Sequence, residues 1–361
     1  MAYTFGLAET PEERAAVFEF RYTIYVEEMG RYQDTADHEH RWLVEPEDDH
    51  SWISYARDGD SVVATSRLTW GPHFSERQIH QYSLAPFLEQ VPAEMMAVGE
   101  RFMVAPDRRG SGLVEELIAH SAELTGSPDV RIMFGACEPH LLPLYLGMGQ
   151  RTYAKKNINS AEAGYLIPLV QFPQGVDALV GVGATSSLEA LVLPPAVDAI
   201  LAGDGAVMSP MLLATGEYRV EVNRALAGLE SDTISAFSGF TDDEEERCLR
   251  HSNIIECDAG DHVLKKGGVA RNMFVVLGGR LEVRDDDRVV AVLSPGDVFG
   301  EMAFLLERPR ALDVYCATDG TRVLSLSEGT LRKMIAQDAD VAAKLLLNVS
   351  KMLCARLIKS N

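Results

Sequence analysis

The sequence predicts an α+β protein with an N-terminal mixed sheet flanked by helices, a helical connector, and a C-terminal β jelly-roll barrel with helices. Helix-like and strand-like stretches alternate over 1–172, whereas short strands separated by turns fill most of 232–361. Between them, 173–231 is rich in Gly, Ala, Pro and Ser, with helices expected at 195–201 and 218–229. Since domains span about 100–200 residues, a chain of 361 residues favours two domains and a connector with these bounds.

The elements of the N-terminal domain follow from local patterns. A helix is expected over 11–29, because Thr10 is a suitable N-cap and acidic residues occupy the first turn. Two strands are expected on either side of Asp58-Gly59-Asp60, which is a hairpin signal. The remaining predicted elements are strands at 97–104, 130–137 and 165–172, a helix at 113–124 and a helix that begins at Leu141.

The C-terminal domain is predicted to be a small barrel because glycine-containing turns recur between short apolar stretches, from Gly260 to Gly320. Helices are expected to follow at 330–337 and 341–359. The second carries apolar residues on one face, namely Val341, Leu345, Val349, Met352 and Leu353. This face is expected to pack on the barrel or on a partner helix, which would allow a homodimer.

Charge and composition exclude several classes of protein. The net charge is −21, so the chain is expected to repel nucleic acid unless basic residues cluster locally. No apolar run approaches the length of a transmembrane helix, and the N-terminal stretch lacks the features of a secretory signal. The five cysteines are scattered, which is typical of reduced thiols in a cytoplasmic protein. No metal site is expected.

The strongest motif is the run from Phe299-Gly300-Glu301 to Pro309-Arg310-Ala311. A helix that begins at a Gly-Glu pair directs free backbone amides toward an anion. Arg310 can donate two parallel hydrogen bonds to a phosphate, and Glu301 can accept one from a ribose hydroxyl. The motif therefore predicts a site for a small phosphate ester that carries a sugar.

This run resembles the phosphate-binding cassette of cyclic nucleotide-binding domains, and the resemblance extends over about 234–357. It assigns nucleotide binding to Phe299, Gly300, Glu301, Met302, Ala303, Arg310 and Ala311. Ala311 points to cAMP, because the family uses Thr there to favour cGMP. Leu312 and Asp313 depart from the family pattern, and the Asp313 charge could repel the phosphate. An internal ion pair between Glu301 and Arg310 is the alternative. Members of this family often end in a DNA-binding helix-turn-helix, but the chain stops at Asn361, so a transcription factor is not expected.

A second motif is a strand, a glycine loop and a helix over 104–113. Glycines let backbone amides approach a pyrophosphate, and the start of the helix supplies positive potential. The residues expected to bind the donor are Val104, Arg108, Arg109, Gly110, Ser111, Gly112 and Leu113.

Together with Tyr145-Leu-Gly-Met-Gly149, this loop resembles the acyl-CoA loop and the Tyr-x-x-x-Gly element of GNAT-fold acyltransferases, over about 5–172. The resemblance implies that Tyr145 is the general acid and that Glu100 is the base, directly or through water. A packed tyrosine and a structural salt bridge are the respective alternatives.

A finer resemblance is to acyl-homoserine-lactone synthases and N-acyl amino acid synthases. It is carried by the helix 20–28, by acids at 48 and 49, and by 99–102. It implies a substrate pocket formed by Arg21, Tyr25, Arg67 and Arg101. The spacing departs from those synthases, because Glu100 directly precedes Arg101. Arg21 and Arg67 could also be ordinary surface charges.

The sequence therefore predicts a cytoplasmic bacterial acyltransferase that cAMP regulates. The donor is acyl-CoA or acyl-ACP, and the acceptor is a small-molecule amine, which would fit long-chain N-acyl amino acid synthesis. A basic cluster that could dock an acyl carrier protein consists of Arg108, Arg109, Arg151, Lys155 and Lys156. The alternatives are a cAMP-regulated protein lysine acetyltransferase and a non-catalytic cyclic-nucleotide sensor or scaffold.

Overall fold

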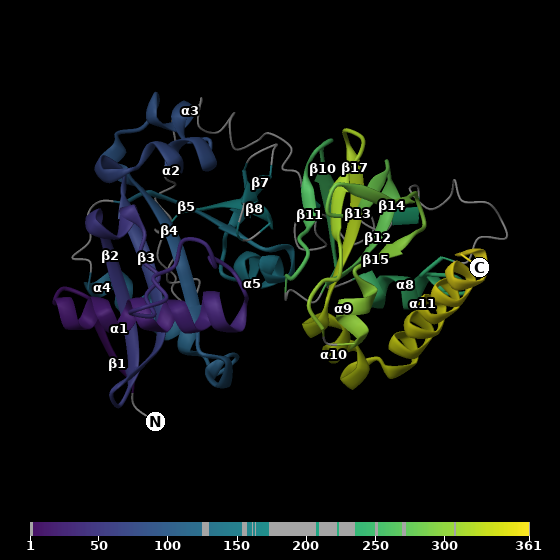
Figure 1. Cartoon of the computed structure of the whole chain (residues 1–361), viewed down its shortest axis with the longest axis horizontal. Coiled ribbons are helices and arrows are strands. Elements are labelled where there is room, and N and C mark those ends of the chain that lie inside the picture. Colours follow the sequence, from purple (N-terminus) through teal and green to yellow (C-terminus); the bar gives the residue numbers. More distant parts are fainter. Residues whose placement is uncertain are drawn as a thin grey trace. The chain divides into compact units, whose positions relative to one another are not determined.

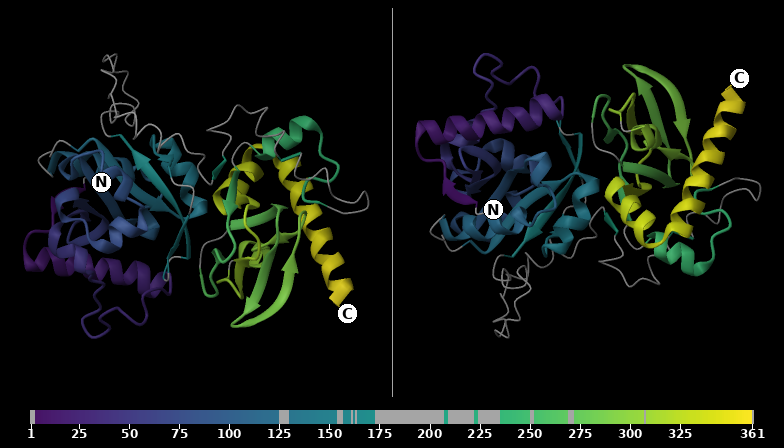
Figure 2. Two further views of the ribbon diagram at one scale, coloured as in Figure 1. Left: turned by 90° about the horizontal axis from the view of Figure 1, so that it is seen from above. Right: turned by 90° about the horizontal axis from the view of Figure 1, so that it is seen from below.

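The structure is a computed structural model, drawn in Figures 1 and 2, and the contacts within the chain divide it into two compact units. It describes residues 3–124, 130–153, 157–160, 162, 164–172, 207–208, 222–223, 235–249, 252–268, 272–306 and 308–360. The first unit comprises Met1–Ala136, Gly147–Ala154 and Pro168–Asp204, and the second comprises Cys137–Leu146, Lys155–Ile167 and Gly205–Asn361.

One mixed sheet organises the N-terminal part of the chain. Its strand order is β1 (Thr4–Leu7), β2 (Ser51–Asp58), β3 (Ser61–Trp70), β4 (Met96–Val104), β5 (Ile132–Cys137), β8 (Gly164–Gln171) and β6 (Arg151–Thr152), and β7 (Ile158–Ser160) pairs with β8. Strands β1 to β4 are joined antiparallel, whereas β4 and β5 run parallel.

Two helices cover opposite faces of this sheet. Helix α1 (Pro11–Tyr22) packs Val17 and Phe18 against Ile53 and Tyr55, which share one face of β2. Helix α4 (Leu113–Leu124) packs against Ala56 on the other face of the same strand. Both faces of the sheet are therefore packed against a helix, because neighbouring residues of a strand point to opposite faces.

Helix α1 begins as predicted, with a capping box between Thr10 and Glu13. The helix predicted to continue to 29 instead changes to a π-helix over Thr23–Glu28. The short helices of this part are α2 (Glu76–Gln81), α3 (Ala85–Leu88) and α5 (Leu142–Gly147).

The C-terminal part is a barrel of two antiparallel sheets with helices. One sheet has the order β15 (Val298–Phe299), β12 (Asn272–Gly278), β17 (Thr321–Ser327), β10 (Asn253–Cys257) and β9 (Val207–Met208). The other has the order β11 (His262–Leu264), β16 (Asp313–Cys316), β13 (Leu281–Asp285) and β14 (Arg288–Leu293). The helices are α8 (Asp242–Leu249), α9 (Glu301–Leu306), α10 (Glu328–Gln337) and α11 (Ala339–Ser360).

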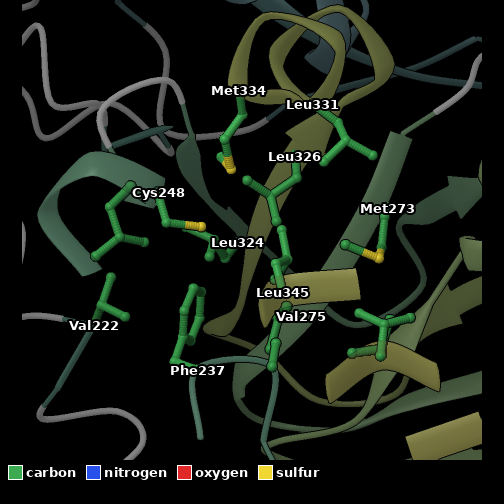
Figure 3. Close-up of a cluster of buried hydrophobic side chains, with 14 of the residues drawn as sticks. Val222, Phe237, Cys248, Met273, Val275, Leu324, Leu326, Leu331, Met334 and Leu345 are labelled. Carbon is green, nitrogen blue, oxygen red and sulfur yellow. The ribbon is translucent and has the colours of Figure 1, made fainter. Parts of the chain in front are cut away.

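The core of this part lies between the five-stranded sheet and the helices (Figure 3). Met273 and Val275 of β12 and Leu324 of β17 meet Met334 of α10 and Leu345 of α11. Helix α11 thus packs on the barrel through the apolar face that its sequence predicts. Both parts together confirm the α+β class.

The connector predicted at 173–231 lies outside the described residues, apart from Val207–Met208 and Val222–Asn223. Its expected helices at 195–201 and 218–229 and the predicted domain boundaries therefore stay predictions. Within the described ranges, no helix is long and apolar enough to cross a membrane.

Candidate functional site

Strands β4 and β5 pair over only part of their length. The parallel pairing runs from Met96 and Ile132 to Val98 and Phe134, whereas β4 continues to Val104 and β5 to Cys137. Gly135 follows the last pair, and a Cβ atom added there would lie 3.4 Å from the carbonyl oxygen of Gly99. Beyond this point, two strand edges can receive an extended ligand.

The glycine loop follows directly after β4. Gly110 and Gly112 have φ angles of +78° and +85°, a region that side chains other than glycine rarely adopt. Ser111 donates from its hydroxyl to the carbonyl oxygen of Arg108 at 2.7 Å, and Leu113 then begins α4 with its side chain buried. The residues predicted to form the donor loop are thus adjacent at a helix N-terminus, where an anion is stabilised.

Both arginines of this loop are already paired with acids. Arg108 contacts Asp58 at 2.9 Å, and Arg109 makes two hydrogen bonds to Glu28, at 2.7 and 2.8 Å. Glu28 ends the π-helix that follows α1. Their charges are therefore compensated, and the backbone and the helix N-terminus remain as the main attraction for a phosphate.

A bulge interrupts β4 beside the loop. Arg101 has a φ of +55° within a strand, and the register with β3 shifts between Thr65 and Arg67. The Arg101 side chain pairs with Glu45, and its guanidinium lies 5.4 Å from the ring centre of Tyr25. The predicted pocket residues Arg101 and Tyr25 are therefore in contact. A strained residue held by an ion pair and an aromatic ring is typical of functional positions.

Arg21 and Arg67, also predicted as pocket residues, belong to a buried ion network. Both donate to the same oxygen of Asp48, at 2.7 and 3.1 Å, and all three side chains are almost completely buried. They are not surface charges. The Nε atoms of both arginines and Nη2 of Arg21 lack a hydrogen-bond partner in the structure.

Glu100 lies at the other end of this network. Its carboxylate accepts hydrogen bonds from Arg67 and Gln78 at 2.8 Å, and from Arg77 and Tyr82 at 3.1 Å. Burial alone would raise the pKa of Glu100, but Arg67, Arg77 and Arg101 outweigh it and lower the pKa to about 2. A carboxylate held in this way is a weak proton acceptor. The geometry thus favours the salt-bridge alternative for Glu100 over general-base catalysis.

Tyr145 is half-buried on α5, within the second unit. Its role as general acid stays a prediction.

The predicted nucleotide cassette is continuous in the C-terminal part. Strand β15 ends at Phe299, whose ring stacks on Phe274 of β12 at 4.9 Å, and α9 begins at Glu301. Gly300 between them has a φ of +75°. A Cβ atom there would lie 2.7 Å from Nη1 of Arg310 and 2.8 Å from the carbonyl oxygen of Asn272. Glycine is therefore required for steric and conformational reasons.

Arg310 is held at the cassette by backbone carbonyls. Its Nη1 donates to Gly300 at 2.5 Å and its Nη2 donates to Asn272 at 2.7 Å, while its buried Nε has no partner. Burial lowers the pKa of Arg310 to about 10. Because both terminal nitrogens contact carbonyls, the geometry does not favour the Glu301–Arg310 ion pair that was the structural alternative.

Glu301 is the other charged residue among those predicted to bind the nucleotide, and it is 5% exposed. Burial raises its pKa, although Arg356 and Arg310 partly offset this effect. Among the other predicted cassette residues, Ala303 is buried, whereas Met302 and Ala311 are exposed. The cassette thus presents two buried, oppositely charged groups at a helix start.

Asp313, the departure from the cassette pattern, has partners of its own. Its carboxylate accepts from His262 Nε2 at 2.8 Å and from the backbone amide of Lys266 at 2.8 Å. These donors reduce its effect as a free negative charge.

Sequence reasoning missed several residues of these sites. Arg77 and Gln78 lie on α2, a helix that no prediction included. Arg356 contacts Glu301 from α11, at 3.4 Å. It could have been found, because it continues the helical spacing of the apolar face. In the described part of the chain, no group of three His, Cys, Asp or Glu residues could hold a metal ion.

Two family models match the chain. Residues 20–119 match the acetyltransferase (GNAT) domain, and residues 254–338 match the cyclic nucleotide-binding domain.

Curated relatives match a limited part of the chain. The Pycsar effector protein XpPycTIR of Xanthomonas perforans is 30% identical over 112 residues, which are 31% of this chain and 37% of that protein. A cAMP-dependent protein kinase regulatory subunit of Eremothecium gossypii is 29% identical over 104 residues, 28% of this chain and 23% of that protein. The chain thus spans well under half the length of both relatives.

Solved structures resemble each part. A CoA-dependent acyl-homoserine lactone synthase, BjaI, aligns with 49% of this chain and 88% of its own, at 19% identity and a TM-score of 0.40. A cyclic nucleotide-binding domain from Methylobacillus flagellatus aligns with 43% of this chain and 85% of its own, at 19% identity and a TM-score of 0.36.

The match to the GNAT domain includes the glycine loop, and the match to the cyclic nucleotide-binding domain includes the cassette. The predicted resemblances to these two families are therefore confirmed. The chain therefore combines a GNAT acyltransferase domain with a cyclic nucleotide-binding domain.

Proposed function

We propose that this protein transfers an acyl group from a thioester to an amine, and that a cyclic nucleotide regulates the transfer. The observation that carries the proposal is the end of the pairing between β4 and β5 at Val98 and Phe134, together with the glycine loop at the start of α4. The unpaired strand edges can bind the extended acyl-pantetheine arm of an acyl-CoA, and the loop can bind the pyrophosphate of CoA.

In the proposed reaction the amine nitrogen attacks the thioester carbonyl carbon. A C–N bond forms, the C–S bond breaks, the amine loses a proton and the leaving thiolate gains one. Tyr145 is the candidate donor of that proton. Since Glu100 is a weak base, we expect the acceptor amine to reach the site already neutral. After the attack its N–H proton passes to solvent, and Tyr145, which protonates the thiolate, regains its proton from solvent.

The charge at the glycine loop favours acyl-CoA as the donor. Docking of an acidic acyl carrier protein requires uncompensated basic side chains. Arg108 and Arg109 are instead paired with Asp58 and Glu28, and Lys155 and Lys156 of the predicted basic cluster lie outside the described residues. A CoA pyrophosphate can use backbone amides, which remain at the loop.

The acceptor is proposed to be a small amine that carries a carboxylate, as in N-acyl amino acid synthesis. The support is Arg21, whose buried Nε and Nη2 have no hydrogen-bond partner although its Nη1 is paired with Asp48; such a guanidinium edge can bind a carboxylate. Acetylation of protein lysines would need no such group, and it is the alternative outcome of the test.

The nucleotide proposal is cAMP at Glu301 and Arg310. A homodimer through α11 is also proposed, since Leu347, Leu357 and Ile358 are exposed on that helix. Light scattering of the purified chain at two concentrations tests the dimer.

Thiol release from a series of acyl-CoA chain lengths tests the transfer, with free amino acids as acceptors and mass spectrometry of the products. An N-acyl amino acid supports the proposal, and acetylated protein would favour the lysine acetyltransferase. Thiol release at background for acyl-CoA and acyl-ACP alike would favour a sensor or scaffold without catalysis.

A further inference from the structure

A tight turn over 265–268 contacts the backbone of the cassette arginine. The amide of Gly268 donates to the carbonyl oxygen of Lys265 at 3.0 Å and closes the turn, and Gly267 within it has a φ of +81°. The amide of Gly267 donates to the carbonyl oxygen of Arg310, and the amide of Arg310 donates to that of Gly268, both at 2.8 Å. A Cβ atom added at Gly268 would lie 3.7 Å from Cγ of Arg310. The turn therefore holds the main chain of Arg310 and lies against the start of its side chain.

Strand pairing alone does not hold this turn in place. Strand β11 ends at Leu264, and its register with β16 shifts between His262 and Leu264, so the turn follows an irregular pairing. In a four-residue turn the hydrogen bond joins the first and the last residue. The amide of the second residue, which is Lys266 here, is therefore available to an acceptor from another part of the chain.

Asp313 supplies that acceptor from the first position of β16. Its Oδ1 atom accepts from the Lys266 amide and from Nε2 of His262, both at 2.8 Å. The side chains of Asp313 and His262 are mostly buried, which strengthens contacts of this kind. The His262 ring also stacks on Tyr315 of β16, with ring centres 4.1 Å apart. One carboxylate oxygen therefore connects the turn to a histidine that the sheet holds.

The place of Arg310 matters because its guanidinium reaches the cassette from this turn. Its terminal nitrogens donate to the carbonyl oxygens of Gly300 and Asn272, and its buried Nε has no partner. A shift of the main chain at Arg310 would move all three nitrogens relative to the helix that begins at Glu301. The arrangement of the cassette thus depends on the turn that holds Arg310.

We propose that Asp313 is a positioning residue of the nucleotide site. It accepts from the Lys266 amide and so holds the turn 265–268, and the turn holds Arg310 in the place from which it binds a phosphate. The inference rests on the proposed binding of a cyclic nucleotide at Glu301 and Arg310. It gives Asp313 the opposite effect to the one that its charge suggests, which is repulsion of the phosphate. The role requires an acceptor oxygen at this position and does not require a negative charge.

The consequence for affinity follows from the population of the binding arrangement. Without the acceptor, the turn and Arg310 have further positions, and the apparent affinity falls by the fraction of molecules that keep the competent one. Removal of the acceptor oxygen is therefore expected to weaken cAMP binding about three- to tenfold, the range expected for one net hydrogen bond.

The test compares Asp313→Ala with Asp313→Asn in the full chain. Asparagine keeps an acceptor oxygen and removes the charge, whereas alanine removes both. Asp285→Asn is the matched control, because Asp285 pairs with the side chain of the same lysine, Lys266, at 2.8 Å rather than with its amide. Calorimetry with cAMP measures the affinity, and hydrogen exchange of the amides of 266–268 and 310 measures the hold on the turn. Circular dichroism checks that each variant is folded.

The two substitutions of Asp313 are expected to differ. Asp313→Ala should bind cAMP about three- to tenfold more weakly, and the amides of 266–268 and 310 should exchange faster than in the wild type. Asp313→Asn and Asp285→Asn should keep the affinity within about twofold and the exchange rates of the wild type. Recovery by asparagine separates the acceptor oxygen from the charge.

The outcomes separate the inference from the function on which it rests. Tighter cAMP binding by both Asp313→Ala and Asp313→Asn would overturn the inference and show that the charge repels the phosphate. Unchanged binding by Asp313→Ala, or equal weakening by both variants, would overturn it as well, while the nucleotide site stands. If the wild type binds neither cAMP nor cGMP at millimolar concentration, the proposed nucleotide site fails. Unchanged exchange of 266–268 and 310 in Asp313→Ala then overturns the hold on the turn, and faster exchange supports it.

Discussion

Two buried glutamates, one in each part of the chain, have opposite electrostatic environments. Glu100 accepts hydrogen bonds from four side chains and its pKa is lowered to about 2, chiefly because Arg67, Arg77 and Arg101 outweigh the effect of burial. Glu301 is buried to a similar extent, but its pKa is raised, because burial outweighs the charges of Arg356 and Arg310.

The difference indicates two kinds of role. A carboxylate whose lone pairs are all occupied stabilises the fold that it joins and has little capacity left for a ligand. A buried carboxylate with one distant cationic partner retains capacity for a new donor. On this basis we expect Glu100 to be a structural anchor of the N-terminal part and Glu301 to be available to a ligand.

The largest expected effect comes from breaking the Glu100 network. Arg67→Met should lower the free energy of unfolding of the first unit by about 3–5 kcal/mol, because it removes a cation that contacts Glu45, Asp48 and Glu100 together and leaves each of these largely buried carboxylates with one cationic partner fewer. Tryptophan fluorescence during urea unfolding measures it, since Trp42, Trp52 and Trp70 all lie in that unit.

The control for this network is Arg41→Gln, which removes an exposed pair with Glu27. It should change the same free energy by less than about 1 kcal/mol. Equal effects of the two substitutions would contradict a structural role for the Glu100 network.

The second effect concerns the nucleotide site. Arg310→Leu should weaken cAMP binding about 100-fold or more, because a buried arginine that faces a phosphate is replaced by an apolar group. Calorimetry measures the affinity, and circular dichroism checks that the variant is folded.

Arg332→Leu is the matched control for Arg310, because Arg332 forms an exposed pair with Glu328 on α10. It should bind cAMP as the wild type does. Undiminished binding by Arg310→Leu would place the nucleotide elsewhere.

The third effect is the response to acid. The folded pKa of Glu100 lies below its usual value of 4.5, so the unfolded chain binds more protons between pH 4.5 and about 2. The contribution of Glu100 to stability is therefore complete above pH 4.5 and lost as the pH falls toward 2. Glu301 has the opposite sign, because its raised pKa costs stability as the pH rises.

Tryptophan fluorescence at constant urea concentration measures the acid response of the first unit. Glu100→Gln should reduce the loss of stability below pH 4.5 and leave the part due to Glu45, whose pKa is also lowered to about 2 because the effect of burial is outweighed by Arg101 and Arg67. Glu301→Gln should leave this signal unchanged. If the stability of Glu100→Gln falls with pH as steeply as that of the wild type, another group is responsible for the loss of stability in acid.

The smallest effect concerns Glu28, a carboxylate that is partly exposed and has one arginine partner. It is one-third exposed and pairs with Arg109 of the donor loop. Glu28→Gln should lower the KM for acyl-CoA about twofold, because it frees an arginine beside the pyrophosphate cradle. Its neighbour Glu27 pairs with Arg41, away from the loop, so Glu27→Gln should leave the KM unchanged. A KM that rises in Glu28→Gln would mean that the pair orders the loop for binding.

Local patterns predicted much of this fold and of both loops. Local sequence signals determine three of these elements: the strands around Gly59, the helix over 113–124 and the cassette from Phe299 to Ala311. The structure has all three at the predicted positions. The π-helix after Tyr22 was not predicted, because its helical periodicity continues while its hydrogen-bond spacing changes.

The long-range partners could not be predicted in the same way. Glu100 meets Arg77 and Gln78 only because α2 is positioned beside β4, and short helices of this kind have weak sequence signals. Whether a glutamate is a base or an anchor depends on those partners. The contact of Arg356 could have been predicted, because the helical spacing of α11 places this residue in line with the apolar face.

Acyl transfer by the full chain with and without cAMP tests the central claim most directly. Thiol release from acyl-CoA is followed in the wild type and in Arg310→Leu, at cAMP concentrations that saturate the wild type. The account predicts that cAMP changes the wild-type rate and leaves the rate of Arg310→Leu unaffected. A wild-type rate that is the same with and without bound cAMP would contradict it.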